Sequence, residues 1–99
     1  MGTIISSRVK DDGKLVFETV VDYDEALQLK GHLSNVHLFS ENSAETKANI
    51  SLRGKNDATT YFLIPKDLRK GLRSNAKTNC QRIDSKGKII FVYVVDKTG

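Results

Sequence analysis

The sequence predicts an α+β fold: a small, mainly antiparallel β-barrel of about seven strands with two short helices. Three observations lead to this prediction. Apolar and polar residues alternate with a period of two along much of the chain, Gly-containing turn signals separate these stretches, and only two segments have helical spacing. With 99 residues, the chain is expected to form a single domain, because a second core would need several dozen more residues.

A β-hairpin is expected at the start of the chain. Residues 3–9 and 14–21 have the composition of strands, and Asp12-Gly13 between them favours a tight turn. Residues 7–22 align without gaps on residues 81–96 with seven of sixteen positions identical, so a similar hairpin is expected near the end. Either shared turn and core requirements or an internal duplication would explain this similarity.

A short helix and a third strand are expected next. Asp22 stands three residues before Glu25, an arrangement typical of a capping box, and predicts a helix that runs toward Gly31. Residues 35–40 have the composition of a strand, and a polar loop follows them. Residues 1–45 therefore predict an acidic half with the order strand, strand, helix, strand.

Residues 46–99 predict a basic half with the order strand, strand, helix, strand, strand. Ile50 and Leu52 alternate with polar residues, which predicts a half-buried strand over residues 46–53. Residues 59–64 are rich in β-branched and aromatic residues and end at Pro65, a residue suited to the entrance of a helix.

The second helix is expected over residues 66–73, with Leu68 and Leu72 one turn apart on its buried side. Four basic side chains would share the opposite side: Lys66, Arg69, Lys70 and Arg73. Two final strands are expected over residues 79–84 and 88–95.

The two halves of the chain carry net charges of opposite sign. Residues 1–47 hold five Lys or Arg and eight Asp or Glu, a balance of −3, whereas residues 48–99 hold eleven and four, a balance of +7. A basic surface of this kind suits a polyanion such as nucleic acid, and a solvated basic surface without a ligand is the alternative.

Catalytic and metal-binding residues are not evident. His32 and His37 have no acid or thiol at ligand spacing, and Cys80 has no recognisable base partner. We therefore expect neither an enzyme nor a cofactor. No apolar run is long enough for a membrane span, no secretory signal is recognisable, and a single cysteine suits a reducing compartment, so a cytoplasmic location is expected.

One motif indicates a family resemblance: Phe62-Leu63-Ile64-Pro65-Lys66-Asp67-Leu68-Arg69-Lys70-Gly71-Leu72. Through this motif, residues 48–95 resemble the AbrB/MazE/SpoVT group of swapped-hairpin DNA-binding domains. The sequence departs from the family at residues 59–61, where the family commonly has Gly and a basic residue, and at residues 73–75, where it has Gly after the helix.

The resemblance implies an intertwined barrel made by two chains, and thus a homodimer that acts as a DNA-binding transcription regulator. Basic side chains around the helix would contact double-stranded DNA, a role that falls by position on Arg69 and Lys70, with Arg53 near another basic position of the family. Together with charge, this predicts six nucleic-acid-binding residues: Arg53, Lys55, Lys66, Arg69, Lys70 and Arg73.

Other interpretations remain open. An RNA-binding or ribosome-associated protein would use the same positive field, and an antitoxin-like interaction module would present the acidic residues 22–45 to a basic protein. Four aromatic residues in predicted strands would serve either as core or as platforms for bases: Tyr61, Phe62, Phe91 and Tyr93.

Overall fold

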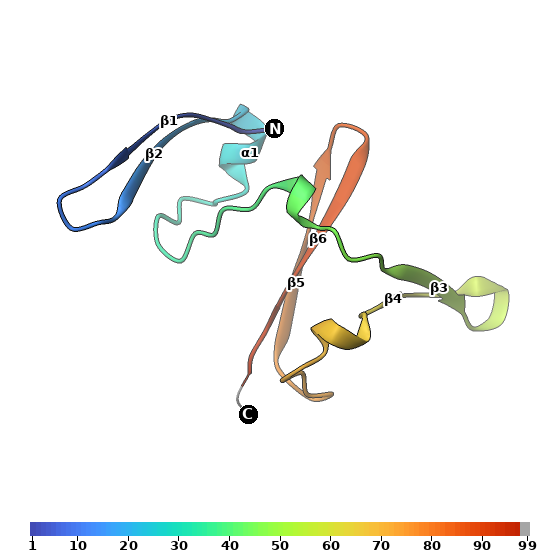
Figure 1. Ribbon diagram of the computed structural model, residues 1–99. Coiled ribbons are helices and arrows are strands. Elements are labelled where there is room, and N and C mark those ends of the chain that lie inside the picture. Colours follow the sequence, from blue (N-terminus) through green and yellow to red (C-terminus); the bar gives the residue numbers. More distant parts are fainter. Residues whose placement is uncertain (98–99) are drawn as a thin grey trace. The chain divides into compact units, whose positions relative to one another are not determined.

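The computed structural model describes residues 1–97 and contains three separate two-stranded antiparallel sheets there (Figure 1). The prediction of a closed barrel of about seven strands is therefore wrong. The described residues form six strands: β1 (Thr3–Val9), β2 (Leu15–Val20), β3 (Asn49–Arg53), β4 (Thr59–Leu63), β5 (Thr78–Ser85) and β6 (Lys88–Val95). Each strand pairs only with its neighbour in sequence, so no sheet closes on itself.

The first and last hairpins confirm the turn signals. In β1–β2, Val9 pairs with Leu15, the Lys10 amide donates to the Lys14 carbonyl at 2.7 Å, and Gly13 adopts a φ of 82°. Gly87, which aligns with Gly13, has a φ of 77° in the β5–β6 turn. Only glycine adopts this left-handed conformation without a steric cost, so the two glycines fix similar turns.

One α-helix, α1 (Tyr23–Leu27), occurs in the described part of the chain. Asp22 is its N-cap residue, but its side chain makes no capping hydrogen bond, so the predicted capping box is wrong. The Asp22 carboxylate instead accepts a hydrogen bond from the Met1 ammonium at 2.8 Å, and Glu25 pairs with the same group. These two carboxylates raise the pKa of the Met1 amine from 8.0 to about 10.

The strand expected over residues 35–40 is absent; the segment is irregular. Lys30, Gly31 and Asn35 have positive φ angles of 51°, 80° and 57°, which bend the chain on both sides of Leu33. A strand also needs a neighbour to accept and donate its backbone hydrogen bonds, and no strand in the described residues pairs with this segment.

The helix expected over residues 66–73 is also absent. A single 3₁₀ turn, Lys66–Leu68, takes its place, and the Leu68, Arg69 and Leu72 amides each donate to the carbonyl three residues earlier. Gly71 adopts a φ of 80° and so interrupts the helical conformation in the middle of the predicted segment. The four basic residues around it therefore do not share one helical face.

The described residues include no buried side chain, so the prediction of a half-buried β3 is wrong. Ile50 and Leu52 are 64% and 55% exposed, and Phe62 on β4 is 42% exposed. A single two-stranded hairpin is marginally stable in water because it has no second layer on which to bury its apolar face. Each hairpin thus presents apolar surface and two unpaired edges.

Contacts divide the chain into two units. The first joins Met1–His37 to Cys80–Val92, and the second joins Leu38–Asn79 to the residues from Tyr93 on. In the first unit, the Gln81 side chain donates to Gln28 Oε1 at 2.6 Å, which links α1 to β5. Among residues 1–97 no helix has both the length and the apolar composition required to cross a bilayer.

Arg82 and Asp84 form an ion pair on one face of β5, because residues two apart in a strand point to the same side. Arg82 Nη2 lies 2.9 Å from Asp84 Oδ1, and the guanidinium carbon lies 5.9 Å from the centre of the Phe91 ring. The hydrogen bonds and charge of Arg82 hold the pKa of Asp84 below its ordinary value of 3.8. The stabilisation this pair provides is present above pH 3.8 and is lost as the pH falls through the lowered pKa.

Replacing Arg82 by Gln should move the titration midpoint of Asp84 back up toward 3.8, because the cation that favours the carboxylate is removed. Carboxyl-carbon NMR shifts recorded across an acid series measure the midpoint. Arg73→Gln removes one positive charge elsewhere in the chain and should leave the Asp84 midpoint unchanged. A midpoint unchanged in Arg82→Gln would show that the ion pair does not form in solution.

Candidate nucleic-acid interface

The β3–β4 hairpin has two chemically different faces, which its register defines. Ile50 pairs with Phe62 and Leu52 with Thr60, and these four residues form what we call the apolar face. The intervening pairs point to the other side, and we call their six residues the polar face: Asn49, Ser51, Arg53, Thr59, Tyr61 and Leu63. Arg53 and Tyr61 thus share a face.

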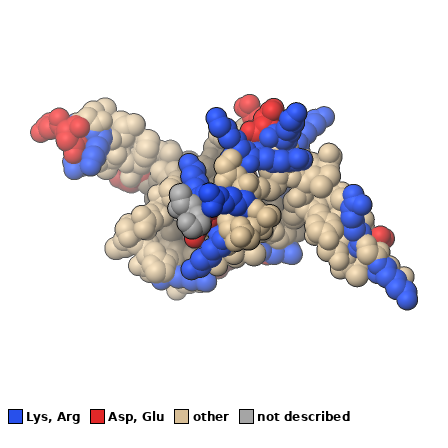
Figure 2. All heavy atoms as spheres, turned by 90° about the horizontal axis from the view of Figure 1, so that it is seen from below, with Lys and Arg blue, Asp and Glu red and all other residues tan. Residues whose placement is uncertain are grey.

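The turn between β3 and β4 carries the next basic residue. Lys55 begins the 3₁₀ turn Lys55–Asp57, and Asn56 and Asp57 in this turn have φ angles of 59° and 54°. Short polar side chains tolerate this left-handed region better than bulky ones. Figure 2 shows mostly Lys and Arg side chains near the end of the β3–β4 hairpin, whereas acidic and basic side chains lie together at the end of the β1–β2 hairpin.

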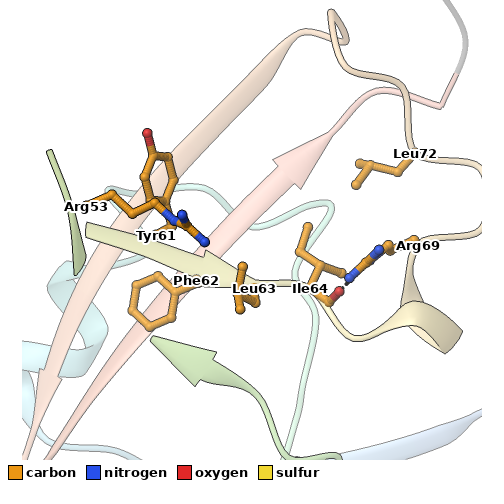
Figure 3. Close-up of a pocket in the computed structure, with 7 residues that line it drawn as sticks. All are labelled: Arg53, Tyr61, Phe62, Leu63, Ile64, Arg69 and Leu72. Carbon is orange, nitrogen blue, oxygen red and sulfur yellow. Dashed lines mark hydrogen bonds between the residues drawn. The ribbon is translucent and has the colours of Figure 1, made fainter. Parts of the chain in front are cut away.

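Arg69 has a structural role that the sequence did not reveal. Its Nε donates a hydrogen bond of 2.6 Å to the carbonyl oxygen of Ile64, immediately before Pro65 (Figure 3). Its other guanidinium nitrogens make no hydrogen bond within residues 1–97. Arg69 therefore fastens the bend at Ile64-Pro65 and keeps part of its hydrogen-bonding capacity for a ligand.

A hollow of about 440 Å³ lies in the second unit, lined by Arg53, Tyr61, Phe62, Leu63, Ile64, Arg69 and Leu72. It brings together two of the six predicted binding residues, Arg53 and Arg69, and adds the ring of Tyr61 (Figure 3). A surface that combines guanidinium groups with an aromatic ring can contact both phosphate and base.

The remaining predicted residues lie outside this hollow. Lys66 is in the 3₁₀ turn, Lys70 precedes Gly71, and Arg73 follows in an irregular segment. Lys70 lines a smaller hollow of about 140 Å³ that Asp96 and Lys97 also line. All six predicted residues are exposed, and none forms an ion pair within the described part of the chain.

Replacing Arg69 by Ala should loosen the bend at Ile64-Pro65, because the Ile64 carbonyl loses its donor. A hydrogen bond of this kind contributes about 0.5–1.5 kcal/mol, and exposure places the effect at the lower end. Backbone chemical shifts of Leu63 and Lys66 would report the change. The same substitution at Arg73 is the control, and equal responses in both variants would contradict the assignment.

Tyr61 lines the hollow and is 48% exposed, whereas the sequence alone left open whether its ring packs in a core or serves as a platform for a base. Its position on the polar face follows from the pairing of Ile50 with Phe62, which sets the parity of every residue on β4. The alternation around Ile50 and Leu52, combined with the turn at Gly54, was the available signal.

The described residues contain no group of three or more His, Cys, Asp or Glu side chains arranged to hold a metal ion. Cys80 is exposed and forms no disulfide. Comparisons with protein-family models, with curated proteins and with solved structures give no match. The resemblance to the AbrB group therefore stays a prediction that rests on the motif around Ile64-Pro65 and Leu68-Arg69.

Proposed function

We propose that this chain is a nucleic-acid-binding protein that contacts phosphates through the basic side chains of residues 53–73, with double-stranded DNA as partner and transcription regulation as role. One observation carries the proposal: this segment holds six Lys or Arg against two Asp, and the six cations are exposed and without ion pairs in the described residues. Cations that are not neutralised by the protein are available to displace the counterions of a polyanion.

The absence of the second helix bears on how DNA would be bound. Reading a major groove requires a helix or a strand pair that fits into it, and the 3₁₀ turn Lys66–Leu68 is too short for that role. The β3–β4 hairpin is the regular element that carries two of the cations, Arg53 on β3 and Lys55 in its turn. We propose phosphate contacts as the main source of affinity, in a cytoplasmic protein that acts as a homodimer.

RNA is the second candidate partner, and Tyr61 favours it. An aromatic ring beside Arg53 on the polar face matches the way proteins bind unpaired bases, which are more common in RNA than in duplex DNA. The two candidates differ in whether the bases are accessible.

Fluorescence anisotropy with three labelled probes tests the proposal: a 20-base-pair DNA duplex, its single strand and an RNA of the same sequence. We expect submillimolar binding of at least one probe, with an affinity that falls steeply as salt rises. Absence of binding to all three at low salt would overturn the proposed function. Where binding is found, recovery of DNA or of RNA in a pull-down from the native cell separates the two candidate partners.

A further inference from the structure

We propose that the polar face of the β3–β4 hairpin binds single-stranded nucleic acid, with Tyr61 stacked on an unpaired base and Arg53 on a neighbouring phosphate. This inference rests on the proposed nucleic-acid function and adds unpaired DNA or RNA as a second form of ligand beside duplex DNA, bound at Tyr61 and Arg53. It is carried by the register of the hairpin, by the hollow beside it and by the charge around it.

The register explains why Tyr61 is not an ordinary apolar residue of the hairpin. The side that alternation marks for burial holds Ile50, Leu52 and Phe62, and Tyr61 points to the opposite side, where its direct partner is Ser51. The Tyr61 side chain is 48% exposed, and it makes no hydrogen bond within the described residues. A large ring on the polar side adds nothing to the burial of the apolar face, whereas it provides a flat surface for a base.

Arg53 has the position that such a contact needs. It pairs with Thr59 and is thus the diagonal cross-strand neighbour of Tyr61. Diagonal neighbours lie roughly 7–8 Å apart, a spacing that long side chains bridge. Both residues line the same hollow, and Figure 3 shows the Arg53 side chain beside the Tyr61 ring. One nucleotide can therefore meet the ring with its base while a neighbouring phosphate meets the guanidinium.

Arg69 also lines this hollow, on the side away from Arg53 in Figure 3, and adds a second positive charge. The rest of the lining is apolar, from Phe62, Leu63, Ile64 and Leu72, which suits the face and edge of a base more than a hydrated phosphate chain. The only acidic residues between positions 53 and 73 are Asp57 and Asp67, and neither lines the hollow.

The contrast with β5 supports the choice of this surface. Arg82 also lies near an aromatic ring, that of Phe91, but Asp84 neutralises it through hydrogen bonds as short as 2.9 Å. A carboxylate at that place repels a phosphate. Arg53 has no such partner in the described part of the chain, so of these two surfaces the β3–β4 surface is the one that combines a ring with an uncompensated cation.

The test measures the affinity of the full chain for labelled oligo-dT, for oligo-U and for a DNA duplex by fluorescence anisotropy. Tyr61→Ala should weaken binding of the single strands roughly 5- to 150-fold, the range found for loss of one stacking ring, and should change duplex affinity less than twofold. Tyr61→Phe keeps the ring and should bind like the parent chain. Tyr23→Ala, a change in the acidic part of the chain, is the matched control and should have no effect.

A second readout does not depend on the stability of the alanine variant. Stacking places a base over the ring, so the Tyr61 ring protons should move upfield on addition of oligo-dT, while those of Tyr23 should stay in place. Binding of single strands with no change in the Tyr61→Ala variant and no upfield shift would overturn this inference and leave the proposed function intact. Absence of binding to every nucleic acid would overturn both.

Discussion

Replacing Lys66, Lys70 and Arg73 together by Ala should make the slope of log affinity for duplex DNA against log salt less negative by about 2.7, because each phosphate contact contributes about −0.9. If the lines of the variant and the parent chain meet near 1 M salt, this change corresponds to an affinity of the variant about 500-fold lower at about 0.1 M. Arg69 is left unchanged in this variant, because its hydrogen bond to the Ile64 carbonyl would add a conformational effect.

The control removes the same charge from the acidic half through Lys10, Lys14 and Lys30, each replaced by Ala. Both variants have a net charge three units lower than the parent, so a difference between them reports the place of the charges and not their number. Fluorescence anisotropy across a salt series provides both slopes. Equal slopes for all three proteins, each folded by circular dichroism, would exclude Lys66, Lys70 and Arg73 as phosphate contacts. The acidic residues 22–45 would then be tested against protein partners.

The chain should sediment as a homodimer of twice 11.0 kDa at micromolar concentration, because Ile50, Leu52 and the strand edges of the hairpins are exposed. Leu52→Asp places a charge on the apolar face. Burying an unpaired charge costs several kcal/mol, so the dissociation constant of the dimer should rise at least about 100-fold.

Ser51→Asp introduces the same charge one residue away, on the polar face, and should leave the dimer intact. Sedimentation equilibrium of the three proteins distinguishes the faces. A parent chain that stays monomeric at high micromolar concentration would contradict the prediction and would favour closure of the apolar faces within one chain.

The hairpins were predictable because their signals are local. Asp12-Gly13 and Lys86-Gly87 determine turns within four residues, and the alternation beside them determines the paired strands. The predicted strand over residues 88–95 agrees with β6 (Lys88–Val95) at both ends. The similarity of residues 7–22 to residues 81–96 supported the same conclusion from an independent comparison within the chain.

The prediction of a closed barrel was wrong, because it extended local patterns to pairings between distant strands. Closure depends on edges that are far apart in sequence, and no local pattern states which edge pairs with which. The helix over residues 66–73 failed for a different reason: the spacing of Leu68 and Leu72 was given more weight than Gly71 between them. Of the candidate site, the cations were identifiable by type, whereas the Arg69 hydrogen bond and the face of Tyr61 depend on geometry.

Pairing between strands that are neighbours in sequence also affects how fast this protein folds. Hairpins form in about 1–10 μs because only a short loop must close, whereas docking and subunit assembly take milliseconds to minutes and depend on concentration. All three sheets here are of the fast kind. If the expected homodimer forms, its slow and concentration-dependent step would be the association of two chains, after the hairpins have formed.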